Sequence, residues 1–205
     1  MMNEKETRHF VFEVRAENNE QYGDYVTGRP IVYNSRTDIG SFDEIIEAGA
    51  LDNADLRDVK FLVNHNMDMI PLARSRNNNA NSTMQMTIDG DGMNIRVNLD
   101  TENNSEARNL YSAIKRGDID GMSFMFTVDG DSWDALESNH PTRHINKIGK
   151  VFEVSAVTFP AYSETSISAR TAETLESARA TLESAKRSGE SIEVERLKAI
   201  IKTKI

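Results

Sequence analysis

The sequence contains no cysteine, only four prolines and no long uncharged apolar stretch. The absence of cysteine excludes a disulfide framework, a thiolate zinc site, an iron–sulfur cluster and a cysteine nucleophile. A membrane-spanning helix needs about 18 apolar residues in a row, and no segment approaches that length. Glu4, Lys5 and Glu6 stand where a secretory signal needs a basic run and an apolar segment. We therefore expect a cytoplasmic chain whose chemistry uses oxygen and nitrogen groups.

Positive charge is also scarce. The chain has 24 Lys and Arg residues against 33 Asp and Glu residues, so its formal net charge is −9. Binding to a polyanion depends on Lys and Arg that neutralise phosphates and release counterions, and a chain of this charge repels such a partner. We expect neither nucleic acid nor a membrane among its partners.

The composition changes near residue 170. A chain of 205 residues suits one domain with an appended tail. After Arg170 there is no aromatic residue and no proline, and the segment is rich in Ala, Glu, Ser and Lys. Leu175 and Leu182 are seven residues apart, and Gly189 precedes a second apolar group that includes Ile192 and Ile201. We predict a main domain over residues 1–169 and a charged extension of two weakly anchored helices over residues 170–205.

Short strands dominate the rest of the sequence. Alternating or continuous apolar runs predict seven strands, and two segments have helical spacing. The polar segment 129–150 is interpreted as turns. This pattern predicts an α+β, mainly β fold with a few helices. The strands are predicted at 9–15, 25–33, 59–64, 83–88, 93–99, 121–128 and 151–158, and the helices at 42–46, preceded by Ser41, and at 101–116, ended by Gly117.

Two interpretations compete for Asp89-Gly90-Asp91-Gly92. The segment joins two strand-like runs, as the turn of a β-hairpin does. It also resembles the opening of a calcium-binding loop, but Asn94 stands where such a loop needs glycine. We favour the hairpin.

Three residues stand out as candidates for chemistry. His65 directly follows the apolar strand Phe61-Leu62-Val63, at a position from which a strand can present a side chain to a rim. Ser123 lies within a run of Met, Phe and Val, where a buried hydroxyl needs a partner and commonly finds a backbone carbonyl. Glu153 interrupts another apolar run and needs a cationic or hydrogen-bonding partner. An imidazole held by Glu153 would satisfy both groups, although each residue also has an ordinary structural interpretation.

Three sequence blocks taken together resemble one known family. These are Leu-Val-Asn-His at 62–65, Gly-Asp-Ile-Asp-Gly-Met-Ser-Phe-Met-Phe at 117–126 and Phe-Glu-Val-Ser-Ala-Val-Thr-Phe-Pro-Ala at 152–161. Their residues, order and separations resemble the signature blocks of the prohead serine proteases of tailed bacteriophages, which are related to the herpesvirus assemblins. The resemblance covers about residues 8–170, and three blocks in fixed order are more specific than one short motif.

The resemblance implies an assemblin-like β-barrel core and a serine endopeptidase that needs no metal or cofactor. Within it, Ser123 is the nucleophile, His65 the general base and Glu153 the orienting acid. His144 is an alternative third member, because herpesvirus relatives use a second histidine. Met125 replaces a glycine that is usual in the family, which bears on the backbone geometry near the nucleophile.

The resemblance also implies the substrates and the place of action. These are the scaffolding segment of the major capsid protein and the protease itself, inside an assembling prohead in the host cytoplasm. Relatives are often activated by self-association, which implies a homodimer. Backbone N–H groups, with Arg74 or Arg76, are the candidate oxyanion donors.

Three alternatives remain open at this stage. The first is a non-enzymatic scaffold or capsid-assembly protein that keeps the protease fold. The second is a hydrolase of the same fold class that acts on a cellular protein. The third is a divalent-metal hydrolase that uses His140, His144 and Asp134.

Overall fold

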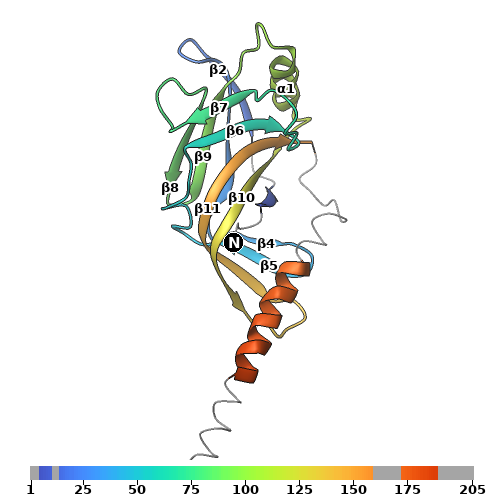
Figure 1. Ribbon diagram of the computed structural model, residues 1–205. Coiled ribbons are helices and arrows are strands. Elements are labelled where there is room, and N and C mark those ends of the chain that lie inside the picture. Colours follow the sequence, from blue (N-terminus) through green and yellow to red (C-terminus); the bar gives the residue numbers. More distant parts are fainter. Residues whose placement is uncertain (1–4, 11–13, 159–171, 189–205) are drawn as a thin grey trace, which may run out of the picture.

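The protein is mainly β, as its computed structural model shows (Figure 1). The structure describes residues 5–10, 14–158 and 172–188. In this part of the chain, eleven strands form two sheets. Most buried apolar side chains of both sheets, and those of the helix α1 (Ser105–Arg116), belong to one core. The fold class expected from the sequence is therefore confirmed in its coarse form.

The larger sheet is built around a long hairpin. Strand β10 (Gly121–Asp134) pairs antiparallel with β11 (Thr142–Val157) over the whole length of both. Five further strands extend the sheet, one beside β10 and four on the side of β11. These are β1 (Lys5–Phe10) beside β10, β5 (Asp43–Ile46) and β6 (Asp58–Val63) beside β11, β4 (Arg36–Asp38) beside β5, and β7 (Ala73–Arg76) beside β6.

The smaller sheet has four antiparallel strands. Their order is β2 (Arg15–Asn19), β3 (Gly23–Val32), β9 (Gly92–Asn98) and β8 (Met84–Asp89). Asp89 and Gly92 close the predicted β8–β9 hairpin, which confirms the hairpin interpretation. The helix α1 follows this sheet and buries Ala107, Leu110 and Ile114.

A closed barrel is not confirmed. Within the described ranges the strands form two separate sheets, and neither closes on itself through backbone hydrogen bonds. The reason lies in β11, which changes its parallel partner along its length. Residues 142–145 of β11 pair with β5, and residues 153–156 pair with β6. The sheet therefore divides into two branches on that side.

Two local predictions are wrong. The segment expected to be a short helix at 42–46 is strand β5, because Glu44 and Ile46 alternate with more exposed neighbours along an edge of β11. The segment 129–150, expected to be turns, contains the ends of the β10–β11 hairpin. The helix expected from Thr101 begins at Ser105, since Asn104 accepts hydrogen bonds from the N–H groups of Glu106 and Ala107. Gly117 ends it in the left-handed conformation, as predicted.

A helix spans 172–188 and lies at the far end of the β10–β11 hairpin (Figure 1). The Arg179 guanidinium donates to the carbonyl oxygens of Leu136 and Ser138, and Leu175 is buried. The second helix predicted for the extension, around Ile192 to Ile201, falls outside the described residues. Among the helices of the described segments, none is both long and apolar enough to cross a membrane.

Candidate active site

His65 lies in a tight turn at the end of β6. Asn64 and His65 both have left-handed backbone conformations, with φ of 51° and 56°. Such conformations are uncommon for residues other than glycine, and Asn and His tolerate them better than most. The Asn64 N–H donates to the Ala156 carbonyl, and the Asn64 side-chain oxygen accepts from the Thr158 N–H. The turn is thereby tied to the end of β11 and brings His65 beside that strand.

The imidazole of His65 contacts the carboxylate of Glu153. The distance between His65 Nδ1 and Glu153 Oε1 is 2.5 Å. The Glu153 side chain is completely buried, whereas 17% of the His65 side chain is exposed. A buried carboxylate is costly unless it is hydrogen-bonded, and the imidazole supplies one of the partners that Glu153 needs. The structure therefore brings together two of the three residues singled out in the sequence.

Ser155 supplies the second partner of Glu153. Its hydroxyl donates to Glu153 Oε2 over 2.6 Å and accepts from the backbone N–H of His65 over 3.1 Å. Ser155 is completely buried. Sequence reasoning passed over this residue, although it stands two positions after Glu153 and therefore faces the same side of the strand.

Ser123 lies on the adjacent strand β10, directly opposite Ser155. Residues that face each other across an antiparallel pair project to the same side of the sheet, with Cβ atoms about 4.5–5.5 Å apart. Met125 faces Glu153 in the same way. The sheet therefore places Ser123, Ser155 and Glu153 on one face, next to the turn that carries His65.

The Ser123 hydroxyl is engaged with strand β1. It donates to the carbonyl oxygen of Arg8 over 2.6 Å, and the side chain is completely buried. A hydroxyl has one proton to donate, so this bond excludes a simultaneous donation to His65. The backbone-carbonyl partner that the sequence suggested for a buried serine is thus present. Attack by Ser123 requires the hydroxyl to leave Arg8.

A buried ion cluster joins β1 to β5 and β11. The Arg8 guanidinium contacts both carboxylate oxygens of Glu44, and Arg143 contacts Glu6, Glu44 and Asp131. Burial alone would raise the pKa of Glu6, but the guanidinium groups of Arg8 and Arg143 outweigh it and lower that pKa. Burial opposes the charge on Arg8, yet Glu44 and Glu6 raise its pKa. Sequence reasoning missed this cluster.

His144 belongs to a different part of β11. Its Nδ1 atom lies 2.6 Å from Glu47 Oε1, and its Nε2 atom lies 3.2 Å from Asp134 Oδ2. It stands nine positions before Glu153 on the strand. Of the two residues considered as third member, Glu153 is the one that contacts His65.

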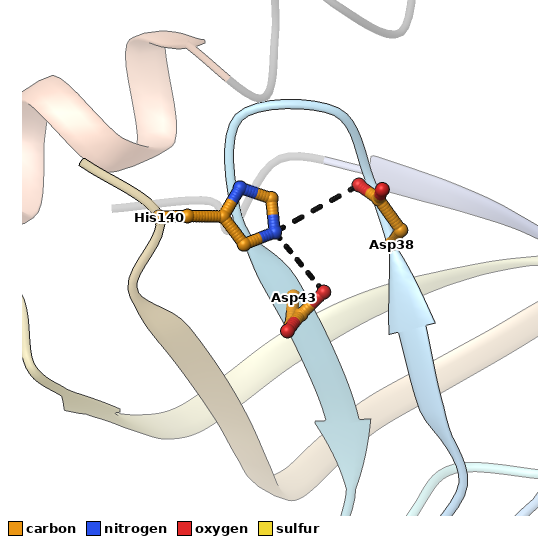
Figure 2. Close-up of side chains that lie close together, drawn as sticks. All are labelled: Asp38, Asp43 and His140. Atoms are coloured by element: carbon orange, nitrogen blue, oxygen red, sulfur yellow. Dashed lines mark hydrogen bonds and ion pairs between the residues drawn. The ribbon is translucent and has the colours of Figure 1, made fainter. Parts of the chain in front are cut away.

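His140 belongs to yet another group, with Asp38 and Asp43 (Figure 2). Its Nε2 atom lies 3.1 Å from Asp43 Oδ1 and 3.9 Å from Asp38 Oδ1. Arg36 also donates to Asp43 over 2.7 Å, so a cation already faces that carboxylate. Burial alone would raise the pKa of Asp43, but hydrogen bonds from Arg36 and His140 lower it. The metal ligands suggested by the sequence are thus divided between two clusters.

The arginines suggested for oxyanion binding lie on β7. The Arg74 guanidinium donates two hydrogen bonds to Asp58, over 2.5 and 2.7 Å, and its bonding to this carboxylate raises the pKa of Arg74. Arg76 is exposed and faces Asp58 in the β6–β7 register. Asp58 begins the strand that His65 follows, so the side-chain contact of Arg74 and the register position of Arg76 lie at the end of β6 remote from His65.

A family model and a solved structure are similar to this chain. No curated protein matches the sequence. Among solved structures, the capsid assembly protease gp21 of bacteriophage T4 is similar with a TM-score of 0.38 and 13% identity. This likeness covers 74% of the present chain and 98% of the other. The family model described as caudovirus prohead serine protease matches residues 10–179, which include His65, Ser123 and Glu153. On this match, the chain belongs to the caudovirus prohead serine protease family.

Proposed function

We propose that this chain is a serine endopeptidase that cleaves the scaffolding segment of a major capsid protein, and itself, inside an assembling prohead in the host cytoplasm. The family membership supports a role as a capsid-maturation protease. The observation that carries the assignment of residues is the 2.5 Å contact between His65 Nδ1 and Glu153 Oε1, beside the strand that carries Ser123.

The roles follow from the chemistry of these groups. When Nδ1–H of His65 donates to Glu153, the lone pair of the imidazole is on Nε2, and this atom is the base. Nε2 takes the Ser123 proton as the hydroxyl oxygen attacks a peptide carbonyl carbon. The imidazolium then gives that proton to the leaving amine, which yields an acyl-enzyme. Glu153 holds the tautomer and stabilises the imidazolium.

The second half of the reaction regenerates the enzyme. His65 Nε2 takes a proton from water, the resulting hydroxide attacks the acyl carbon, and the proton returns to Ser123 as the ester bond breaks. The charged oxygen of each tetrahedral intermediate needs hydrogen-bond donors, and backbone N–H groups are the donors we propose. Arg74 is unsuited because its guanidinium is engaged with Asp58.

The proposed function has a direct test. The full chain is co-expressed with the major capsid protein of the same virus, as the wild type and as His65→Ala and Ser123→Ala. We expect truncation of the capsid protein with the wild type only. The same truncation with all three chains would contradict the proposal and favour a non-enzymatic assembly role.

Self-cleavage is followed separately by mass spectrometry of the protease. We propose that the extension after residue 169 is removed by the protease. Loss of the extension from the wild type and not from Ser123→Ala would support this. Equal loss from both chains would assign the cut to another enzyme.

A further inference from the structure

Ser155 links the backbone of His65 to the carboxylate of Glu153. Its proton is donated to Glu153 Oε2 over 2.6 Å, and its oxygen accepts from the His65 N–H over 3.1 Å. A serine hydroxyl has one proton and two lone pairs, so both contacts can be made at once. Ser155 is completely buried, so water is not available to replace it.

Each contact restricts one of the two proposed catalytic partners. The bond to Oε2 restricts rotation of the carboxylate and leaves Oε1 facing His65 Nδ1. The bond from the N–H restricts the turn in which His65 has a left-handed backbone, a conformation that the surroundings must hold. One hydroxyl therefore controls the orientation of the acid and the position of the base.

We propose that Ser155 is a positioning residue for the His65–Glu153 pair, an inference that rests on the proposed function. Removal of the hydroxyl leaves Glu153 Oε2 without this donor and the His65 N–H without this acceptor. The expected loss of activity is about 10–100-fold, which is the scale on which groups that orient the residues of a site act.

Ser155→Ala and Ser155→Thr test this, with Ser75→Ala as a matched control. Ser75 is also a completely buried serine on a strand, but it lies on β7. The first readout is the downfield proton resonance of the His65 imidazole N–H bound to a carboxylate, assigned with His65→Gln. The second is the rate of capsid-protein truncation. We expect Ser155→Ala to broaden or shift the resonance and slow truncation, and Ser155→Thr to restore both.

An unchanged resonance and an unchanged rate in Ser155→Ala would overturn the positioning role. So would equal effects of Ser155→Ala and Ser75→Ala, which would indicate a general packing defect. Absence of truncation by the wild type would instead contradict the proposed function, and the resonance would still report whether Ser155 orients His65.

A different observation concerns strand β1. Ser123 is completely buried, its hydroxyl donates to the Arg8 carbonyl, and the Cα register partner of Ser123 on β1 is His9. A peptide carbonyl carbon must come within about 3–3.5 Å of a nucleophile before attack. A substrate therefore has no access to the Ser123 oxygen while β1 occupies this edge of β10.

The side chains of β1 hold the strand in that position. Arg8 contacts both oxygens of Glu44 on β5, and Glu6 contacts Arg143 on β11. Arg8, Glu44 and Arg143 are all buried. Because these charges balance one another away from water, separation of β1 from β10 also breaks buried ion pairs, and opening is opposed.

The geometry points to β1 as a cover that must leave β10 before Ser123 reacts, an inference that also rests on the proposed function. The absence of cysteine from the sequence provides a clean test. Lys5 and Thr127 are register partners across β1 and β10, so Lys5→Cys with Thr127→Cys places two thiols at a distance suited to a disulfide. Thr87→Cys with Asn94→Cys gives a control disulfide between β8 and β9.

The probe is a fluorophosphonate that labels reactive serines, used on the oxidised and the reduced protein. With β1 locked, we expect labelling of Ser123 to fall at least about tenfold, and reduction to restore it. The control disulfide should change nothing. Equal labelling of the locked and the reduced protein would overturn the cover. Glu44→Gln, in which the contact that holds β1 is weakened, is labelled in parallel. If neither this variant nor either form of the disulfide protein is labelled, Ser123 is not a reactive nucleophile, and the proposed role of β1 as its cover is contradicted as well.

Discussion

His65 and Glu153 are separated by 88 positions in the sequence, yet the imidazole nitrogen Nδ1 lies 2.5 Å from the carboxylate oxygen Oε1. The contact exists because β6 and β11 are parallel neighbours, with Glu153 beside Lys60 and Ala156 beside Val63. The turn at Asn64 and His65 then folds the ring back over β11. The acid and the base thus come from two adjacent strands, and Ser123 comes from a third.

Glu153→Gln tests whether activity requires His65 to be correctly oriented and not only to be present. Glutamine preserves the shape of the side chain but cannot stabilise an imidazolium, and its amide favours the wrong tautomer of His65. We expect the rate of capsid-protein truncation to fall by about 10³-fold or more, as it does when the orienting carboxylate of a triad is lost. His144→Gln is the control, since His144 contacts Glu47 and Asp134. A larger loss in His144→Gln than in Glu153→Gln would assign the third role to His144.

Glu44→Gln is expected to destabilise the fold strongly. The variant leaves the buried guanidinium groups of Arg8 and Arg143 without a charge that now balances them. Loss of one partner from a buried ion pair costs about 3–5 kcal/mol, which urea unfolding followed by circular dichroism would measure. Asp118→Asn removes one partner of the exposed Arg116–Asp118 ion pair and should change little. Equal effects of the two variants would contradict the structural importance of the buried cluster.

Gly92→Ala should be much more destabilising than Gly90→Ala, although the two glycines lie in the same turn. A Cβ atom on Gly92 would stand 2.0 Å from the carbonyl oxygen of Ile31, and the backbone φ of 136° is unfavourable for alanine. A Cβ atom on Gly90 meets nothing within 4 Å. We expect Gly90→Ala to change the free energy of unfolding by less than about 1 kcal/mol. A similar midpoint of thermal unfolding for both variants would argue against the close approach of β9 to β3.

Glu6 makes stability depend on acidic pH. Its pKa in the folded protein is lowered from the ordinary value of 4.5, so the folded state binds this proton less readily than the unfolded state. Its contribution is therefore complete above about pH 4.5 and is lost as the pH falls through the lower folded value. We expect the stability difference between wild type and Glu6→Gln to be constant from pH 7 to 6 and to shrink toward pH 3. Urea unfolding at each pH measures this, and a difference that grows on acidification would contradict it.

Local sequence patterns predicted the elements whose contacts are local. The β8–β9 hairpin depends on its own turn, and α1 ends at Gly117 for reasons contained in its last residues. Phe42, Ile45 and Ile46 satisfy helical spacing and so predict a helix where the structure has strand β5. What makes this segment a strand is its pairing with residues 142–145, about 100 positions away in the sequence. Glu44 is buried in contact with Arg8 and Arg143, and nothing in the sequence around Glu44 indicates this burial.

The candidate site likewise has features that local sequence patterns predict and features that depend on distant contacts. His65 directly follows an apolar run, Ser123 and Glu153 interrupt apolar runs, and the resemblance to a family joins the three residues. The turn conformation of Asn64, the double contact of Ser155 and the bond from Ser123 to Arg8 depend on the pairing of β6, β10 and β11 with β1. Such pairings set side-chain contacts that no single segment encodes.

Strand β1 is the outermost strand beside β10, so its departure has a consequence for solubility. The N–H and C=O groups of β10 that pair with residues 5–10 would then line an open sheet border. Unpaired borders of this kind recruit other extended chains, whether a target or another copy of the same molecule. Any treatment that separates β1 from β10 and exposes Ser123 should therefore also make the protein more prone to associate. Dilute solution should then favour turnover over aggregation.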